Sequence, residues 1–371
     1  MKFLSKNKNQ INMKNLKLLV FALLSFVVLL SSCGSEEKPN AEAKDLKKEV
    51  VVEKSNEFTI LSEYLKTQGD YLNAPSEKGG APQIIEATEL NDLLGGYVLI
   101  LDLRSPKSFA EGHISGAENV SFGTLVNYMN DEVQVDNFDK IVMVCYTGQT
   151  SGMATSILRM LGFNTVYSLK WGMSSWNMKF AEKKWLARTT DDYVDMLEIT
   201  NNAKPSGGAF PEIETGNTDP KEILTEQAYL IFAKGFGNMT AKASDVFGDP
   251  SAYYIINVAT PDAYAVGHIP TAVNYAPKGS LVYDVDLNTI PADKPILVYC
   301  ATGQYAAQVV AYLRVLGYDA YTLLYGANSF MHKVLIENGV PAFSKKAINN
   351  FEFEESDFTG GAVEEEGAGG C

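Results

Sequence analysis

The chain has 371 residues, of which 46% are hydrophobic, and its formal net charge is −14 at pH 7. This length and apolar content predict a globular protein with about two domains of roughly 100–200 residues each. The acidic balance excludes nucleic acid and anionic lipid headgroups as main partners, because both require a basic surface.

The N-terminus has the pattern of a targeting segment. Lys14 and Lys17 precede the apolar run LLVFALLSFVVLL, which is followed by SSC ending at Cys33. The run is shorter than the ~20 residues that span a bilayer, and its end resembles the lipobox of bacterial lipoproteins. We therefore predict a signal peptide over residues 1–32 and lipidation of Cys33, with the protein in the bacterial cell envelope, on the periplasmic side or the cell surface. An ordinary secretion signal or a transmembrane anchor is the alternative.

The rest of the chain divides by composition. Residues 33–55 are charged and poor in apolar residues, which predicts a disordered tether, and residues 346–371 form an acidic, glycine-rich tail. Between them we expect a first domain over 56–187, a polar linker over 188–220 and a second domain over 221–345, each domain beginning with a helix.

The two predicted domains are copies of one pattern. The stretch CYTGQTSGMATSILRMLGF begins at Cys145 and CATGQYAAQVVAYLRVLGY begins at Cys300, 155 residues later. The same interval relates Gly112-His113 to Gly267-His268 without insertion or deletion. The chain is therefore a tandem duplication.

Each copy alternates strand with helix. Apolar runs of buried-strand type occupy residues 97–103 and 141–146 in the first copy and 253–258 and 295–300 in the second. The segment after each cysteine has apolar residues at helical spacing. This alternation predicts an α/β fold with a mainly parallel central sheet in each domain and helices on both faces.

The placement of the two cysteines suggests a chemical role. A cysteine at the carboxyl end of a buried strand, followed by a short glycine loop and a helix, lies where open α/β sheets bind ligands. Lowering a thiol pKa from ~8.5 to ~6.5 requires about 2.7 kcal/mol, and helix-end effects supply roughly 0.3–2 kcal/mol, so several backbone amides must converge on the sulfur. Such a loop would favour a nucleophilic thiolate.

These residues resemble the rhodanese family over roughly residues 82–187 and 240–343. The resemblance rests on the two cysteine loops and on LDLRSPKSFAEGHISGAENV and INVATPDAYAVGHIPTAVNY, which precede them. It implies that Cys145 and Cys300 carry sulfur as a persulfide and pass it to a nucleophilic acceptor. The donor-binding residues that it implies lie in the two loops: Tyr146, Thr147, Gly148, Gln149, Thr150, Ala301, Thr302, Gly303, Gln304 and Tyr305.

The sequence departs from the family at the end of each loop. Active rhodanese loops commonly end in arginine, where this chain has Thr150 and Tyr305, and neither loop contains an arginine. We therefore reject phosphatase activity and expect weak activity with thiosulfate, a dianion that arginine would bind. The expected partners are a small persulfide or polysulfide donor and a thiol or protein acceptor, with no cofactor and no metal ion.

Other functions remain open. The chain could be a non-catalytic rhodanese-like binding module, since a buried cysteine that ends a strand is a common core residue. A thiol redox protein is disfavoured because neither loop holds a second cysteine. His113 and His268 are expected to be structural. Arg104 and Glu111, both absent from the second copy, are expected to form an ion pair with each other.

Overall fold

The computed structural model describes residues 56–358. The predicted signal peptide (1–32), Cys33 with the tether to residue 55, and residues 359–371 of the predicted tail lie outside the described residues. Across 56–358, no helix combines the length and the apolar character needed to cross a membrane.

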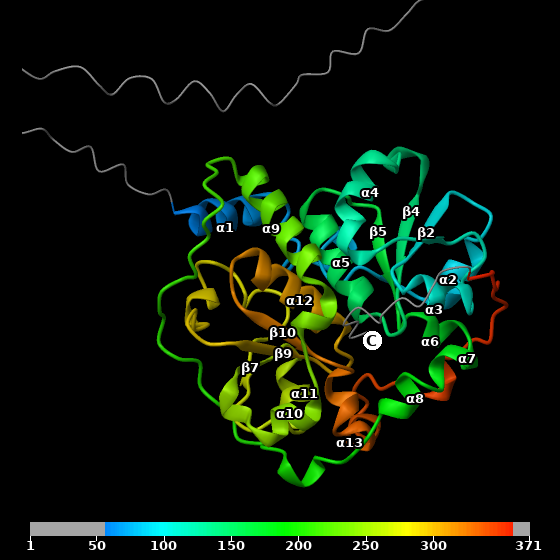
Figure 1. Ribbon diagram of the computed structural model, residues 1–371. Helices are drawn as coiled ribbons and strands as arrows, with labels where there is room; N and C mark the ends of the chain where they lie inside the picture. The colour runs from blue at the N-terminus through cyan, green and yellow to red at the C-terminus, as the bar shows by residue number, and fades with distance from the viewer. Residues whose placement is uncertain (1–55, 359–371) are drawn as a thin grey trace, which may run out of the picture. The chain divides into compact units, whose positions relative to one another are not determined.

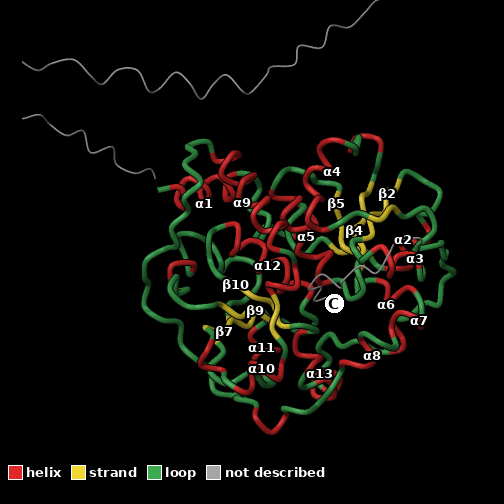
Figure 2. The backbone as a smooth tube through the Cα atoms, in the orientation of Figure 1, coloured by secondary structure: helices red, strands yellow, loops and turns green. Residues whose placement is uncertain are grey.

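Each half of this region contains a parallel five-stranded sheet (Figures 1 and 2). The first sheet has the order β1-β5-β4-β2-β3 and the second has β6-β10-β9-β7-β8, so both halves share one topology. The strands are β1 Ile84–Ile85, β2 Val98–Asp102, β3 Glu118–Asn119, β4 Lys140–Val144, β5 Val166–Leu169, β6 Thr240–Ala241, β7 Tyr254–Asn257, β8 Val273–Asn274, β9 Ile296–Tyr299 and β10 Ala320–Leu323.

Helices connect these strands and cover the sheets. Those of the first half are α1 Glu57–Thr67, α2 Ala87–Asp92, α3 Pro106–Ala110, α4 Leu125–Asp131, α5 Gln149–Met160, α6 Met173–Trp176, α7 Met178–Ala181 and α8 Trp185–Arg188. Those that follow are α9 Pro220–Lys234, α10 Ala243–Gly248, α11 Pro261–Ala265, α12 Gln304–Val315 and α13 His332–Glu337. The predicted lead-in helices are confirmed as α1 and α9.

Alternate residues of the buried strands point into different cores. In β2, Leu99 and Leu101 join the cluster that contains α5, whereas Ile100 joins a separate cluster with Trp176 of α6. Successive side chains of a strand point to opposite faces, so apolar helices cover both sides of the sheet. The predicted fold class is confirmed.

The core between the halves is continuous. Helices α5 and α12 pack directly against each other (Figure 1), and their buried side chains belong to one hydrophobic cluster. Ser156 of α5 donates from Oγ to the carbonyl of Gln308 on α12 at 3.0 Å. Each of these helices follows a cysteine loop, so their packing brings together the regions that carry the two loops.

Each half is also covered by a segment that follows the other half's last strand. After α8, the chain runs onto the second half, where Glu198 forms an antiparallel bridge with His268. Residues 349–358 return to the first half, where Glu354 forms the matching bridge with His113. We call residues 189–202 and 349–358 the first and second strap. The second strap belongs to the sequence predicted as tail.

Candidate active site

The first cysteine loop turns backbone amides toward the sulfur of Cys145. Cys145 follows β4, and Gly148 at φ +86° precedes the first residue of α5. This left-handed conformation favours glycine. The Gly148 N–H lies 3.1 Å from Cys145 Sγ and the Ser151 N–H lies 3.5 Å from it. Amides at the start of a helix stabilise negative charge, so the loop is built to hold a thiolate.

Hydroxyl groups extend this network behind the sulfur. Ser151 Oγ lies 3.4 Å from Cys145 Sγ and 2.8 Å from Ser168 Oγ on β5. Cys145 is only 3% exposed. The sulfur thus contacts polar groups of the loop and the helix, and Ser168 of the neighbouring strand holds one of them, which differs from the apolar surroundings of a structural core cysteine.

The turn after β5 fixes the back of this loop. The N–H of Met173 donates to the Cys145 carbonyl at 2.8 Å, and Ser174 donates to the Tyr146 carbonyl from both its N–H and its hydroxyl. Gly172 has no room for a side chain, since a Cβ there would lie 2.3 Å from the Cys145 carbonyl oxygen. Trp171, just before it, has φ +61°, an uncommon conformation for a residue other than glycine.

Arg104 forms an ion pair with Asp102, so the predicted pair with Glu111 is wrong. Arg104 Nη2 lies 2.6 Å from Asp102 Oδ2 and donates to the Gly112 carbonyl at 2.7 Å. Asp102 is the last residue of β2, two residues before Arg104, and is buried, whereas Glu111 is exposed and can keep its charge in water. Burial alone would lower the pKa of Arg104, but the Asp102 carboxylate outweighs it and the pKa is raised.

Two cationic groups lie against the aromatic ring of the first loop. The Arg104 guanidinium is 4.9 Å from the Tyr146 ring centroid, and Lys184 Nζ is 4.4 Å from the same centroid. The loop itself contains no arginine. Folding supplies positive charge from outside it, at distances of cation–π contact.

The second loop lacks most of the groups that surround Cys145. Among the described residues, the only polar contact shown for Cys300 Sγ is with Thr302 Oγ1 at 3.9 Å. Ala306 stands where the first half has Ser151, and within the described region the buried Thr322 Oγ1, in the place of Ser168 Oγ, has no hydrogen-bond partner. Burial raises the pKa of the Tyr305 phenol, and a negative charge on Cys300 would raise it further.

The predicted loop residues separate into two groups. Thr147 and Gly148 lie beside Cys145, and the Thr147 carbonyl accepts from Trp185 Nε1 at 3.3 Å. Gln149 and Gln304 instead extend their side chains into the opposite half. Gln149 Oε1 accepts from the Tyr325 N–H at 2.8 Å, and Gln304 Oε1 accepts from the Trp171 N–H at 2.9 Å.

The two histidines have structural contacts, as predicted. His113 stacks on Phe109 and its Nδ1 lies 2.9 Å from the Phe109 carbonyl. His268 stacks on Tyr264 in the same way, with Nδ1 3.1 Å from the Tyr264 carbonyl. Both rings are buried and lie beneath the straps.

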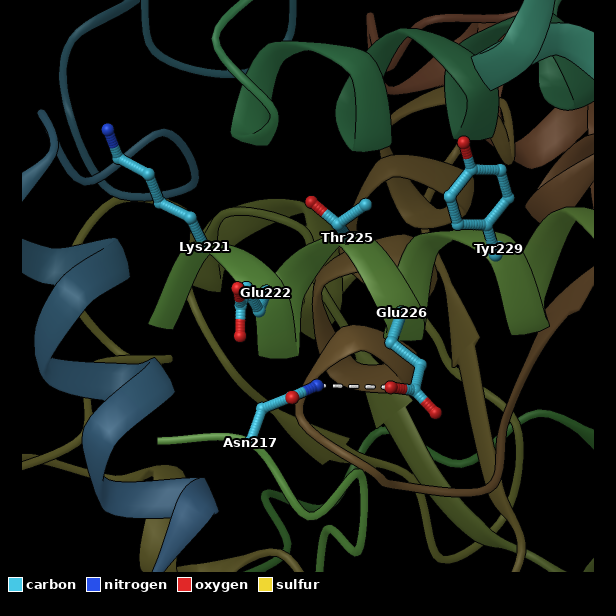
Figure 3. Close-up of a pocket in the computed structure, with 6 residues that line it drawn as sticks. All are labelled: Asn217, Lys221, Glu222, Thr225, Glu226 and Tyr229. Carbon is cyan, nitrogen blue, oxygen red and sulfur yellow. Dashed lines mark hydrogen bonds between the residues drawn. The ribbon is translucent and has the colours of Figure 1, made fainter. Parts of the chain in front are cut away.

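A groove on α9 is lined by residues outside the two cysteine loops (Figure 3). Asn217 donates to Glu226 Oε2 at 3.1 Å across it. The groove is lined by Asn217, Lys221, Glu222, Thr225, Glu226 and Tyr229. None of these residues belongs to a cysteine loop.

Comparison with known proteins identifies the family. The model of the rhodanese-like domain matches residues 86–179 and 240–333, together about half of the chain. The chain belongs to the rhodanese-like domain family. Its two rhodanese-like domains correspond to the two halves described above, which confirms the resemblance drawn from the cysteine loops.

Curated relatives support the same assignment. The chain is 38% identical over 87 residues to "Thiosulfate sulfurtransferase GlpE" of Pseudoalteromonas translucida, covering 23% of this chain and 79% of the relative. It is 37% identical over 95 residues to the protein of the same name from Shewanella oneidensis, covering 26% of this chain and 86% of the relative. Among solved structures, a rhodanese-like domain protein from Staphylococcus aureus is 27% identical with a TM-score of 0.22, over 24% of this chain and 87% of that one.

Some features of this rhodanese-like site were not predicted from sequence. Ser151, Ser168 and Lys184 contribute to the first site, and Gln149 and Gln304 join the two halves. Comparing the copies offered one signal, because Ser151 becomes Ala306 while the cysteines, glycines and glutamines of the loops are unchanged.

Proposed function

We propose that the protein is a sulfurtransferase or persulfide carrier whose first domain performs the chemistry through Cys145. The observation that carries this proposal is the convergence of the Gly148 and Ser151 N–H groups on Cys145 Sγ. Hydrogen bonds to the charged form of a group favour that form, so the thiolate is stabilised without a charged residue in the loop.

The proposed reaction has two displacement steps. The Cys145 thiolate attacks the outer sulfur of a persulfide or polysulfide, the donor's S–S bond breaks, and the shortened donor leaves as a thiolate. The acceptor nucleophile then attacks the outer sulfur of the Cys145 persulfide and releases the Cys145 thiolate. No external oxidant or reductant is consumed.

The buried position of Cys145 limits the size of the sulfur donor. A thiol that is 3% exposed suits a small donor better than a sulfur atom on a folded protein surface. Because the loop ends in Thr150 and has no guanidinium to bind a dianion, we propose that thiosulfate is a poor donor. Thr150→Arg would then raise thiosulfate turnover, while Thr150→Met, of similar length but neutral, would not. Strong thiosulfate activity in the parent would contradict this donor preference.

Peptide-resolved mass spectrometry after polysulfide treatment tests the central proposal. We expect a gain of about 32 Da, one sulfur atom, on the Cys145 peptide and transfer of that sulfur to an added thiol. Cys145→Ser should abolish the transfer. If the Cys145 peptide gains no sulfur while the protein is folded, the protein does not work in this way.

The second domain fits the alternative function of a non-catalytic module. Within residues 56–358, no backbone amide contacts Cys300 Sγ, and Cys300 packs within the hydrophobic core. We therefore expect less sulfur on the Cys300 peptide than on the Cys145 peptide in the same experiment. Equal uptake by both would show that the amide contacts do not decide reactivity.

We further propose that the protein is lipid-anchored through Cys33 in the cell envelope. The supporting observation is the LSSC pattern at the end of the apolar N-terminal run. Labelling with a fatty-acid analogue and membrane fractionation test it, since Cys33→Ala should lose both the label and the membrane association. Identical fractionation of the two proteins would refute the anchor.

A further inference from the structure

The two cysteine loops exchange glutamine side chains across the interface of the halves. Gln304 begins α12 in the second half, yet its side-chain oxygen accepts a hydrogen bond from the N–H of Trp171 in the first half at 2.9 Å. The Gln304 residue is only 2% exposed. This amide is therefore fixed inside the protein by a partner 133 residues away in the sequence.

The same amide touches the glycine that binds the sulfur. A Cβ built on Gly148 would lie 2.4 Å from Gln304 Oε1, so only a glycine allows the two groups to approach this closely. Gly148 in turn directs its N–H to Cys145 Sγ at 3.1 Å. Gln304 is thus packed directly behind an amide that contacts the sulfur.

Gln304 also supports the turn that holds the Cys145 loop from behind. Its partner Trp171 has an uncommon φ of +61°, a conformation that persists only when its surroundings enforce it. The residues that follow, Gly172 and Met173, pack on the Cys145 carbonyl. One side chain of the second half therefore contacts the first loop at Gly148 and the turn behind that loop at Trp171.

We propose that Gln304 is a positioning residue for Cys145, holding the Gly148 amide on the sulfur of the other domain. The second domain would then serve the reaction by shaping the first active site. The reciprocal contact of Gln149 with Tyr325 does not position an amide on Cys300, because among the described residues Cys300 Sγ receives no backbone amide. This inference rests on the proposed role of Cys145.

The test is the pH dependence of alkylation, followed by mass spectrometry on the separate Cys145 and Cys300 peptides of the full chain. In Gln304→Ala we expect Cys145 to react with iodoacetamide about tenfold more slowly at neutral pH, with its pH midpoint raised, because a poorly aligned amide stabilises the thiolate less. Gln304→Met keeps the side-chain length but loses the acceptor for Trp171, and it should slow Cys145 similarly.

Controls separate positioning from a general loosening of the interface. Gln308 lies one turn later on α12, is buried, and accepts from Tyr71 Oη at 2.9 Å. Gln308→Ala should lower stability without changing the Cys145 profile. The charged groups near the first loop, Arg104 and Lys184, are unchanged in all variants. The Cys300 rate should change less than twofold in the Gln304 variants.

The outcomes are distinct. An unchanged Cys145 profile in folded Gln304→Met, or equal changes at Cys145 and Cys300, would overturn the positioning role. Alkylation requires no sulfur donor, so this result is independent of polysulfide uptake. A parent Cys145 that takes up no sulfur would defeat the proposed function but leave the effect of Gln304 on the thiol measurable.

Discussion

At the scale of single residues, the two halves show which groups depend on one another. Asp102 and Arg104 of the first half become Asn257 and Ala259 in the second. The backbone contact is preserved, since Asp102 Oδ1 accepts from the Arg104 N–H at 3.0 Å and Asn257 Oδ1 accepts from the Ala259 N–H at 2.9 Å. Only the ion pair is absent from the second half, where the neutral residues Asn257 and Ala259 keep the same backbone contact.

This comparison predicts the energetics of the buried pair. Arg104→Ala alone should lower the free energy of unfolding by about 3–5 kcal/mol, because it leaves the Asp102 carboxylate buried and unpaired. Asp102→Asn together with Arg104→Ala reproduces the second half's residues and should cost clearly less than Arg104→Ala. Denaturant unfolding of the single and double variants gives the coupling energy. Additive costs would show that the two side chains are energetically independent.

The sequence predicts the Cys145 loop but not the distant residues that hold it in place. The strand, the cysteine, the glycine loop and the helix are adjacent in sequence, so their pattern identified the loop and the fold class. Arg104 was correctly singled out as half of a pair, but spacing alone could not distinguish Glu111 from Asp102 as the partner. Gln149 and Gln304 resemble ordinary polar loop residues, because their partners lie 176 and 133 residues away.

At the scale of elements, the straps explain why composition was a poor guide at the end of the second half. Residues 349–358 are mostly polar, and their one alternating stretch, Phe351 to Glu354, is only four residues long. These residues are held on the first half by backbone hydrogen bonds and a few aromatic contacts. Phe351 packs on Trp176, and Glu352 accepts from Trp176 Nε1 at 2.8 Å. Such contacts are set by the folded surface, so the sequence of the strap alone does not reveal them.

Removing the second strap should therefore weaken the first half. A chain that ends after residue 348 loses the bridge to His113 and the contacts with Trp176, and we expect its free energy of unfolding to fall by about 2–5 kcal/mol. A chain that ends after residue 358 keeps the strap and is the matched control. Denaturant unfolding followed by tryptophan fluorescence measures both. Equal stability of the two shortened chains would show that the strap contributes nothing.

At the scale of the whole described region, three kinds of contact join the two halves. One hydrophobic cluster contains residues of both α5 and α12, the loop glutamines cross between the halves, and each strap covers the opposite half. Independent domains fold as separate units only when few contacts cross their boundary. These contacts indicate that the duplication produced a single cooperative unit.

The three tryptophans of the chain make this cooperativity measurable. Trp171, Trp176 and Trp185 all lie in the first half, and Trp171 and Trp185 also pack on Phe343 of the second half, so their fluorescence reports the unfolding of the first half and the loss of its contacts with the second. Leu297 is fully buried in the second half, and Leu297→Ala should cost about 2–5 kcal/mol through the cavity that it leaves. If the halves unfold together, this distant substitution lowers the denaturant midpoint of the fluorescence transition, and that midpoint coincides with the one measured by circular dichroism. The matched substitution in the first half, Val142→Ala, at the equivalent buried position, should likewise keep both signals coincident. A fluorescence midpoint that does not move in Leu297→Ala would mean that the halves unfold separately, and the support of Cys145 by the second domain would then be confined to local contacts.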